Sequence, residues 1–340
     1  MKFLRLPPLP TVRDLVKLYR LNAVKQLSQN FLMDERMIAK MVKKAGRLKH
    51  SHVLEVGPGP GGITRAILRK MPERVIVIEK DRRFKPFLEM LADAFATVDG
   101  KMEVIYDDIM RINMNNVFPK EEKRSWEEGC PKVHLIGNLP FNVSTPLIIL
   151  WLHAISERRG PWSMGRTKMT LTFQKEVAER LVADVTEDQR CRLSVMAQAW
   201  THPQLQFIIP GKAFVPQPDV DVGVVTFTPL VKPRTKHNFK LFEKITRHVF
   251  SFRQKYNIKC VATLFPPELR EQLSLMMFRL CNLQPNMIST QLSVDDIDKL
   301  CSAYLYLCDK HPEITTYNYR ASRKILPVNM TQNVEIEACI

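Results

Sequence analysis

The segment Asn138-Leu139-Pro140-Phe141 combines residue types that can make an aromatic amine nucleophilic. The exocyclic amine of a base reacts poorly because its lone pair is delocalised into the ring. Two acceptors aimed at its hydrogens, the side-chain oxygen of Asn138 and the carbonyl oxygen of Leu139, would localise that pair on nitrogen. Pro140 keeps the residue before it extended, and Phe141 offers a face on which a base can stack. The alternative is a plain turn before a helix capped by Ser144.

The segment from Glu55 to Thr64 contains four glycines between a short apolar run and a helical pattern. A strand that ends in glycines and turns into a helix brings backbone close to a ligand, where any Cβ would obstruct it. Gly57, Gly59 and Gly62 also match the G-x-G-x-x-G fingerprint of dinucleotide sites. We expect Gly57, Gly59 and Gly61 to contact a nucleotide-like cofactor.

Two further features of this segment favour S-adenosylmethionine over a dinucleotide. Glu55 lies two residues before the first glycine, where a carboxylate can receive the methionine ammonium group. Pro58 and Pro60 stiffen the turn and remove two amide donors that a pyrophosphate would need. A Gly/Pro turn without a ligand is the alternative. The sequence therefore predicts a site for S-adenosylmethionine.

Acidic residues at two later strand ends fit the nucleoside half of that cofactor. Glu79 follows the first glycine by about twenty residues, and an acid at that distance accepts hydrogen bonds from ribose hydroxyls. Asp108 lies at the end of the third predicted strand, where it could accept from the adenine amino group. Asp107 competes with Asp108 for this role.

Two segments that contain aromatic residues have open interpretations. Gln29-Asn30-Phe31-Leu32 precedes the first helix of the domain. It could close over the methionine end of the cofactor or act as a plain hydrophobic staple. Phe214 begins a stiff loop, 214–220, before the last strand. It could stack on the other face of the target base or pack in the core.

The elements that must position these residues alternate between strands and helices. Alternating βα units imply a mainly parallel sheet with helices on both faces. Sites in such sheets lie at the carboxyl ends of the strands, where the motifs above fall. We predict strands at 52–56, 74–78, 102–106, 133–136 and 167–173, late strands at 204–209 and 222–228 that could form a hairpin, helices at 34–46, 61–71, 82–96, 144–155 and 175–183, and a loop at 111–131.

The composition is that of a basic globular protein. The 51 Lys and Arg exceed the 35 Asp and Glu by 16, which is the electrostatic footprint of a polyanion binder. No apolar run approaches the roughly 20 residues needed to cross a membrane, so we expect no membrane attachment. The seven cysteines form no C-x-x-C pair, and we expect reduced thiols and no metal.

The composition becomes strongly basic near residue 230. Residues 232–259 hold nine Lys and Arg against one acid, interleaved with Phe250, Phe252 and Tyr256. Phosphate contacts and stacking together suit structured or single-stranded RNA; a solvated helical face is the alternative. We divide the chain into an N-terminal segment 1–27, a methyltransferase domain 28–230, a basic helical RNA-binding domain 231–326 with one helix capped at Ser293, and a tail 327–340 whose lack of pattern is typical of disorder.

The first 27 residues are rich in Lys and Arg, contain one acid, Asp14, and include an amphipathic stretch after Pro10. This is the mitochondrial targeting pattern. An ordinary first helix capped by Thr11, with Asp14 three residues later, is a compatible interpretation. We therefore expect location in the mitochondrial matrix.

These motifs together resemble the ribosomal RNA adenine dimethyltransferase family of the KsgA type. The resemblance covers about Gln26 to Pro229 and is weaker in the C-terminal domain. The opening 5–11, Arg-Leu-Pro-Pro-Leu-Pro-Thr, is similar to the mitochondrial branch of the family. The resemblance implies a Rossmann-like class I methyltransferase fold with a smaller C-terminal helical domain. The motifs that carry it, in the order of the family, are Gln29–Leu32 with Asp34, Glu55–Thr64, Glu79, Asp108, Asn138–Phe141, Phe173–Ala178 and Phe214–Pro218.

The resemblance also implies a substrate. It is a pair of adjacent adenines in the terminal hairpin loop of mitochondrial small-subunit rRNA, each dimethylated at N6 during ribosome assembly. We expect a monomer. Two departures from the family are Asp107, where Gly is common, and Arg253-Gln254-Lys255, where bacterial relatives have Arg-Arg-Lys. The cofactor contacts that the resemblance implies are Gln29, Leu32, Gly57, Glu79, Lys80, Asp108 and Asn138.

Three other functions share some of these features. A mitochondrial transcription or ribosome-assembly factor could use the scaffold and the basic domain for binding alone, although Glu55, Glu79 and Asn138 are all intact. A large-subunit rRNA adenine methyltransferase of the antibiotic-resistance type shares the motifs, but the N-terminus and the long C-terminal domain argue against it. A dehydrogenase would not need Asn138–Phe141. We therefore expect an rRNA (adenine-N6,N6-)-dimethyltransferase.

Overall fold

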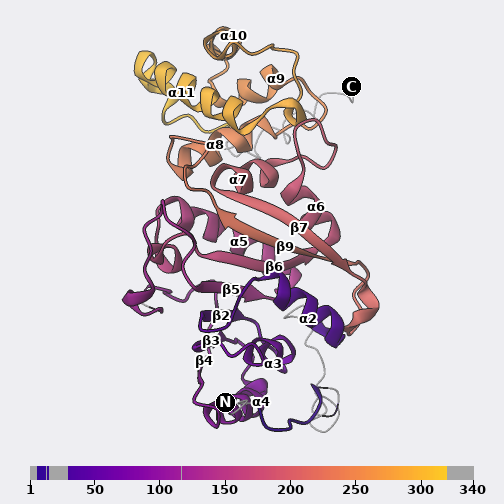
Figure 1. Cartoon of the computed structure of the whole chain (residues 1–340). Helices are drawn as coiled ribbons and strands as arrows, with labels where there is room; N and C mark the ends of the chain where they lie inside the picture. Colours follow the sequence, from indigo (N-terminus) through magenta and orange to yellow (C-terminus); the bar gives the residue numbers. More distant parts are fainter. Residues whose placement is uncertain (1–5, 13, 15–29, 116, 320–340) are drawn as a thin grey trace, which may run out of the picture. The chain divides into compact units, whose positions relative to one another are not determined.

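A seven-stranded sheet is the centre of the first of two units, Met1–Thr235 and Lys236–Ile340, into which the chain divides. The computed structural model describes residues 6–12, 14, 30–115 and 117–319. The strand order is β4-β3-β2-β5-β6-β9-β7, and the labels follow that order up Figure 1. Neighbours from β4 to β6 pair in parallel, and β9 pairs antiparallel with β6 and β7. The mainly parallel sheet and the late hairpin are confirmed. The strands are β2 His52–Val56, β3 Arg74–Ile78, β4 Lys101–Ile105, β5 Val133–Gly137, β6 Lys168–Gln174, β7 Thr201–Ile209 and β9 Val222–Pro229.

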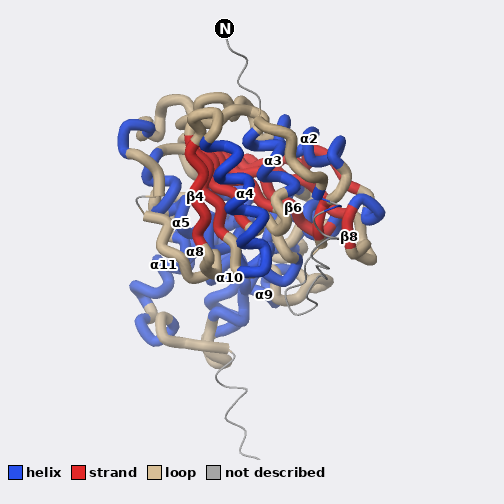
Figure 2. The backbone as a smooth tube through the Cα atoms, turned by 90° about the horizontal axis from the view of Figure 1, so that it is seen from below, coloured by secondary structure: helices blue, strands red, loops and turns tan. Residues whose placement is uncertain are grey.

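Helices cover both faces of this sheet, as Figure 2 shows for α3 and α4 on one side and α5 on the other. Each helix turns its apolar residues inward, because residues three and four apart share a face. In α4, for example, Phe87, Leu88, Leu91 and Phe95 are fully or almost fully buried. The helices of this unit are α2 Glu35–Lys44, α3 Gly62–Leu68, α4 Lys85–Ala96, α5 Phe141–Ser156, α6 Lys175–Val182 and α7 Arg192–Trp200.

The second unit is helical, as predicted. Its longest helix begins at the predicted cap, because Ser293 Oγ accepts a hydrogen bond from the Asp296 amide at 3.1 Å. The Asp296 carboxylate accepts in return from the Ser293 amide, also at 3.1 Å, which satisfies two amides at that end of the helix. The helices are α8 Phe239–Val249, α9 Asn257–Val261, α10 Arg270–Cys281 and α11 Val294–Lys310.

Two helices differ from the prediction. The helix expected at 144–155 already begins at Phe141, because Pro140 is extended and serves as its N-cap. Ser144 therefore lies in the first turn, where its hydroxyl donates to the Phe141 carbonyl. Helix α7 was not predicted at all. These corrections place Phe141 on rigid structure rather than in a loop.

The sequence of connections places the ligand motifs at a switch point of the sheet. Strands β3 and β4 follow β2 towards one edge of the sheet. Strands β5 and β6 follow towards the other edge, so the order reverses between β2 and β5. The crevice outside the carboxyl ends of β2 and β5 is where open α/β sheets bind ligands. Gly57 follows β2 and Asn138 follows β5, and a Cβ on Gly57 would lie 3.7 Å from the Asn138 carbonyl oxygen. The two motifs therefore meet.

A two-stranded antiparallel sheet lies beside this crevice. Its strands are β1 Phe31–Leu32 and β8 Phe214–Val215.

Near the N-terminus, the predicted cap at Thr11 is present, since the Asp14 amide donates to Thr11 Oγ1 at 3.1 Å. The rest of the predicted first helix, Gln29 and the tail 327–340 lie outside the described residues. No helix in the described parts of the chain is long and apolar enough to span a membrane.

Replacing Gly61 with alanine is expected to destabilise the fold by about 1–3 kcal/mol. Gly61 has a φ of 83°, and an added Cβ would lie 2.5 Å from Cδ1 of the buried Leu91. Both the backbone and the packing therefore oppose a side chain at this position. The free energy of unfolding in urea measures the effect. Gly129→Ala is the matched control, because an added Cβ there meets nothing within 4 Å, and equal values for the two variants would contradict the prediction.

Candidate active site

Two adjoining cavities lie at the switch point, and they share Phe31, Gly57 and Asn138. Most of the predicted site residues line one or both, although they come from segments more than 150 residues apart. The first cavity is lined by Asn30, Phe31, Gly57, Gly59, Glu79, Asn138, Leu139, Pro140, Phe141 and Phe214. The second is lined by Phe31, Leu32, Gly57, Pro58, Pro60, Gly62, Ile63 and Asn138.

The glycine turn forms a cradle that only glycine can build. Gly57, Gly59 and Gly61 have φ values of 66°, 54° and 83°, in the left-handed region that favours glycine. The Phe31 ring stands over the turn, so that a Cβ on Gly59 would lie 3.2 Å from it. Gly57 and Gly59 line the first cavity, where backbone can approach a ligand closely. Gly61, also expected to contact the cofactor, lines neither cavity, and its missing Cβ leaves room for Leu91.

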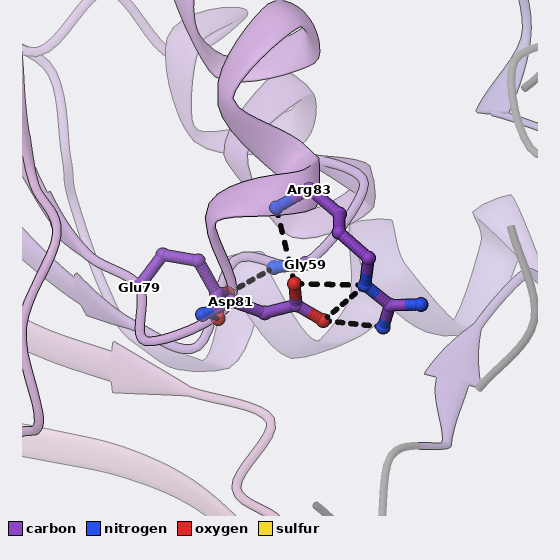
Figure 3. Close-up of polar contacts among 4 residues, drawn as sticks. All are labelled: Gly59, Glu79, Asp81 and Arg83. Carbon is purple, nitrogen blue, oxygen red and sulfur yellow. Dashed lines mark hydrogen bonds and ion pairs between the residues drawn. The ribbon is translucent and has the colours of Figure 1, made fainter. Parts of the chain in front are cut away.

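Glu79 is held at the end of β3 by two backbone amides, as Figure 3 shows. Its Oε2 accepts from the Gly59 amide at 3.0 Å, and its Oε1 accepts from the Asp81 amide at 2.8 Å. Asp81 is fixed in turn by Arg83, whose Nε donates to Oδ1 of Asp81 at 2.9 Å. The carboxylate is only 6% exposed, and burial raises the pKa of Glu79. Each oxygen keeps lone pairs for hydroxyl donors.

Glu55 lies beneath the cradle in β2 and lines neither cavity. It is 1% exposed, and neither carboxylate oxygen has a hydrogen-bond partner among the described residues. Burial raises the pKa of Glu55 to about 8; the polar groups of Thr64 close to the carboxyl, although outside hydrogen-bonding geometry, oppose the shift, and Glu79 adds to it. A buried carboxyl without a partner is costly, and a cationic ligand would supply the missing partner.

The side-chain amide of Asn138 is held from both ends. Its Nδ2 donates to the Asn30 carbonyl at 3.0 Å, and its Oδ1 accepts from the Thr172 hydroxyl at 2.9 Å. Thr172 Oγ1 also accepts from the Leu139 amide at 3.1 Å. These contacts fix which atom of the amide is the oxygen. Since an amide oxygen has two lone pairs, one remains available for a ligand.

The rest of the Asn138–Phe141 motif also faces the first cavity. The Leu139 carbonyl accepts no hydrogen bond within the described chain, so it is a second available acceptor. Phe141 lines the cavity from the start of α5, and Phe214 lines it from β8. Phe214 is 2% exposed and belongs to the hydrophobic core. It therefore packs in the core and lines the cavity at the same time.

Lys80 and Asp108 lie apart from both cavities. Lys80 Nζ contacts Oδ2 of Asp108 at 3.0 Å. A hydrogen bond from the Met110 amide, followed by that from Lys80, lowers the pKa of Asp108. Asp107 is exposed, and its Oδ1 accepts from the Asp108 amide. The structure thus brings Asp108 rather than Asp107 into a fixed pair with a cation.

The basic segment 232–259 is only partly a solvent-facing cationic surface. Lys244 Nζ donates to the Tyr304 hydroxyl at 2.6 Å, and burial lowers the pKa of Lys244. By contrast, Phe252 and Tyr256 are 36% and 54% exposed. These exposed rings flank Arg253 and Lys255 in the chain, which keeps stacking on RNA bases available to this segment.

Comparison with known proteins places this geometry in one family. Residues 20–303 match the family described as ribosomal RNA adenine dimethylase. The chain belongs to this family. Human "Dimethyladenosine transferase 1, mitochondrial" is 51% identical over 320 residues, which are 94% of this chain and 92% of that protein. The protein of the same name from Xenopus tropicalis is also 51% identical, over 93% of this chain and 90% of its own length.

The chain therefore belongs to the mitochondrial branch of the family and is an rRNA adenine dimethyltransferase, as the motifs predict. Its fold is shared with a dimethyladenosine transferase from Plasmodium falciparum, at a TM-score of 0.59 and 22% identity over 81% of this chain and 96% of that one. The 23S rRNA methyltransferase ErmE has a TM-score of 0.54 at 16% identity, over 81% of this chain and 99% of its own. The 23S rRNA methyltransferase thus shares the fold, while the high sequence identity lies with the mitochondrial relatives.

Sequence reasoning missed two residues that support this site. Thr172 holds Asn138, and Asp81 donates its amide to Glu79. The role of Asp81 could have been predicted from the sequence, because it lies two residues beyond the predicted ribose-binding acid Glu79. Thr172 had none, because its contact depends on which residues of β5 and β6 are neighbours.

Proposed function

We propose that this dimethylase transfers methyl groups from S-adenosylmethionine to N6 of two adjacent adenines in the 3'-terminal hairpin of mitochondrial small-subunit rRNA, within an assembling subunit. The observation that carries the proposal is the fixed Asn138 amide. Asn138 lines a cavity that is also lined by Leu139, whose carbonyl accepts no hydrogen bond within the described chain, and by the aromatic residues Phe141 and Phe214. An arrangement of this kind recognises a planar base with an exocyclic amine.

The residues around the glycine cradle fit S-adenosylmethionine, which would supply an activated methyl group to the site. Glu79 offers carboxylate oxygens to ribose hydroxyls. Glu55 offers an unpartnered buried carboxyl to an ammonium group. Pro58 and Pro60 lack the amide donors that a pyrophosphate would need, which disfavours a dinucleotide at the same turn. Asp108, paired with Lys80, is proposed to accept from the adenine amino group of the cofactor, and Gln29, Asn30 and Leu32 to cover its methionine end.

The Asn138–Phe141 motif prepares the target amine for transfer. Asn138 Oδ1 and the Leu139 carbonyl accept its two hydrogens, which draws the nitrogen lone pair out of the ring. Phe141 and Phe214 hold the base between aromatic faces. Because Thr172 and Asn30 already fix the amide, the acceptor is preorganised and loses little orientational freedom during the reaction.

The test is methyl transfer from labelled S-adenosylmethionine to the terminal hairpin in unmethylated small subunits, with the product nucleoside identified by mass spectrometry. We expect N6,N6-dimethyladenosine at both adenines. A hairpin with the two adenines replaced by guanines is the control and should accept no label. Binding of cofactor and RNA without any product would instead favour a transcription or assembly factor on a methyltransferase scaffold.

Cofactor binding is expected to release close to one proton near pH 7 if Glu55 receives the ammonium group. With a pKa of about 8, Glu55 is mostly protonated at pH 7 in the free protein, whereas the bound cation requires the ionised form. Affinity should therefore rise with pH, by up to about tenfold per unit, and level off above about pH 8. Calorimetry in two buffers of different ionisation enthalpy measures the released proton.

Glu55→Gln keeps the shape of the side chain and removes the titrating group. We expect this variant to bind the cofactor more weakly and without proton release. Glu73→Gln changes an exposed glutamate and should behave as the wild type. A wild-type protein that releases no proton between pH 6 and 7.5 would show that Glu55 does not meet the ammonium.

A further inference from the structure

Helix α2 carries a row of cations on its solvent face. Ile38, Met41 and Val42 are buried on one side of the helix. At about 100° per residue, Arg36, Lys40, Lys43 and Lys44 fall within roughly 100° on the opposite side, and all four are exposed. We call these four residues the cationic stripe. Between residues 36 and 50 the chain has six Lys and Arg and no acid.

The stripe is not neutralised within the described protein. No carboxylate of the described residues forms an ion pair with any of its four members. Elsewhere in this unit helical cations do pair, as Lys85 does with Glu89 and Arg180 with Glu176. Lys40 Nζ instead lies 4.2 Å from the centre of the Phe207 ring.

Such a row works against the stability of the helix. Arg36 and Lys40, and Lys40 and Lys44, are like charges four residues apart. Each such pair is unfavourable by about 0.2–0.5 kcal/mol. These repulsions oppose the favourable positions of Lys43 and Lys44 in the last turn of the helix and of Lys40 over the Phe207 ring. An anionic partner would offset the repulsion.

The stripe begins beside the active site. Strand β1 leads into α2 and pairs with β8, Phe31 with Val215 and Leu32 with Phe214. A hollow of about 500 Å³ lies next to this pair, and its lining includes the cations Arg36 and Lys212 and the acids Asp34 and Glu35. Val215 also lines it and is 48% exposed. In Figure 1, α2 lies beside the turn that connects β7 to β9.

We propose that the cationic stripe and Lys212 bind consecutive phosphates of the RNA strand that flanks the target adenine. The proposal rests on the proposed function and gives the first unit an RNA surface of its own, in addition to the basic segment 232–259. Arg36 to Lys44 spans about 12 Å at 1.5 Å per residue. A row of that length can contact a few consecutive phosphates of one strand.

The chemistry of the stripe favours a nucleic acid strand over an acidic protein. It is linear, of one sign and without exposed large apolar residues among its members. Protein interfaces, in contrast, centre on buried apolar or aromatic anchors. Phosphate contacts position a strand without reading its sequence. The stripe would thus supply affinity and register, while Asn138–Phe141 selects the base.

The test compares two triple variants with the same change in net charge. Lys40→Gln, Lys43→Gln and Lys44→Gln neutralise most of the stripe. Lys101→Gln, Lys120→Gln and Lys132→Gln neutralise three exposed lysines that line neither cavity and lie outside α2. The dissociation constant for the hairpin RNA is measured against salt concentration, with cofactor affinity and thermal unfolding as checks on the fold.

Loss of three phosphate contacts should make the slope of log K against log salt shallower by about 2, at roughly 0.7 per phosphate on a single strand. The dissociation constant should rise at least tenfold at low salt, and the KM for RNA should rise more than kcat falls. The control variant should keep the wild-type slope. Thermal stability of the stripe variant should stay close to that of the wild type, because relief of the like-charge repulsion is offset by loss of the Lys40 contact with Phe207 and of two cations in the last helical turn.

Equal slopes for the two variants would overturn the proposal, as would a hairpin affinity unchanged by the stripe substitutions. A wild-type protein that does not bind the hairpin would overturn it too. These outcomes differ from failure of the proposed function, which appears as RNA binding without dimethyladenosine. In that case the difference in slope still decides whether the stripe binds RNA.

Discussion

Asn138→Ala is expected to lower the rate of methyl transfer by about 10³-fold, because it removes a preorganised group that acts on the reacting nitrogen. A loss of this size corresponds to about 4 kcal/mol of transition-state stabilisation. Asn138 Oδ1 is fixed by Thr172, and Nδ2 by the Asn30 carbonyl, so the substitution removes an oriented acceptor and leaves the Leu139 carbonyl as the second one. The measurement is single-turnover transfer to the hairpin, with cofactor and RNA both saturating.

The matched control is Asn142→Ala, because Asn142 is exposed in the first turn of α5. It should retain wild-type rates. Cofactor affinity of the Asn138→Ala protein should stay within about tenfold of wild type, since Glu79 and the glycine cradle are untouched. A variant that loses less than tenfold in rate would mean that the Leu139 carbonyl alone activates the amine.

The parts of this site that sequence reasoning found are those coded by local chain geometry. The turn after β2 needs glycines with positive φ, and Gly57, Gly59 and Gly61 have it. Asn138 and Pro140 follow a short apolar strand whose end could be located from the pattern of β-branched residues. Alternating strands and helices then determine that these ends meet at one edge of the sheet.

The parts that it missed depend on contacts between distant segments. The Thr172 hydroxyl reaches Asn138 because Gly137 pairs with Leu171 in the parallel register of β5 and β6. Nothing in either strand alone specifies that register. Lys244 looked like one more cation for RNA, but α11 brings Tyr304 against it and buries it. Helix α2 was predicted, yet the sequence could not show that none of its exposed cations forms an ion pair with an acid of the described residues.

Thr172→Val is expected to lower kcat by about 10–100-fold while changing the KM for RNA and the affinity for cofactor by much less. Valine has nearly the shape of threonine but lacks the hydroxyl that donates to Asn138 Oδ1 at 2.9 Å. Without it the amide oxygen is free to turn away from the target amine. The Leu139 amide also loses its acceptor at 3.1 Å. A buried donor left without a partner costs about 1–3 kcal/mol of stability, so the unfolding midpoint should fall as well.

Two further variants separate positioning from stability. Thr172→Ser keeps the hydroxyl and should recover most of kcat, even if the lost methyl group leaves the protein less stable. Thr170→Val changes a buried threonine two residues earlier on β6 that is not hydrogen-bonded to Asn138; it should leave kcat near wild type. If Thr172→Ser and Thr172→Val lose kcat equally, the hydroxyl does not orient the amide. The fixed geometry of Asn138 would then have to come from its bond to the Asn30 carbonyl, which is the remaining contact that holds the side chain in place.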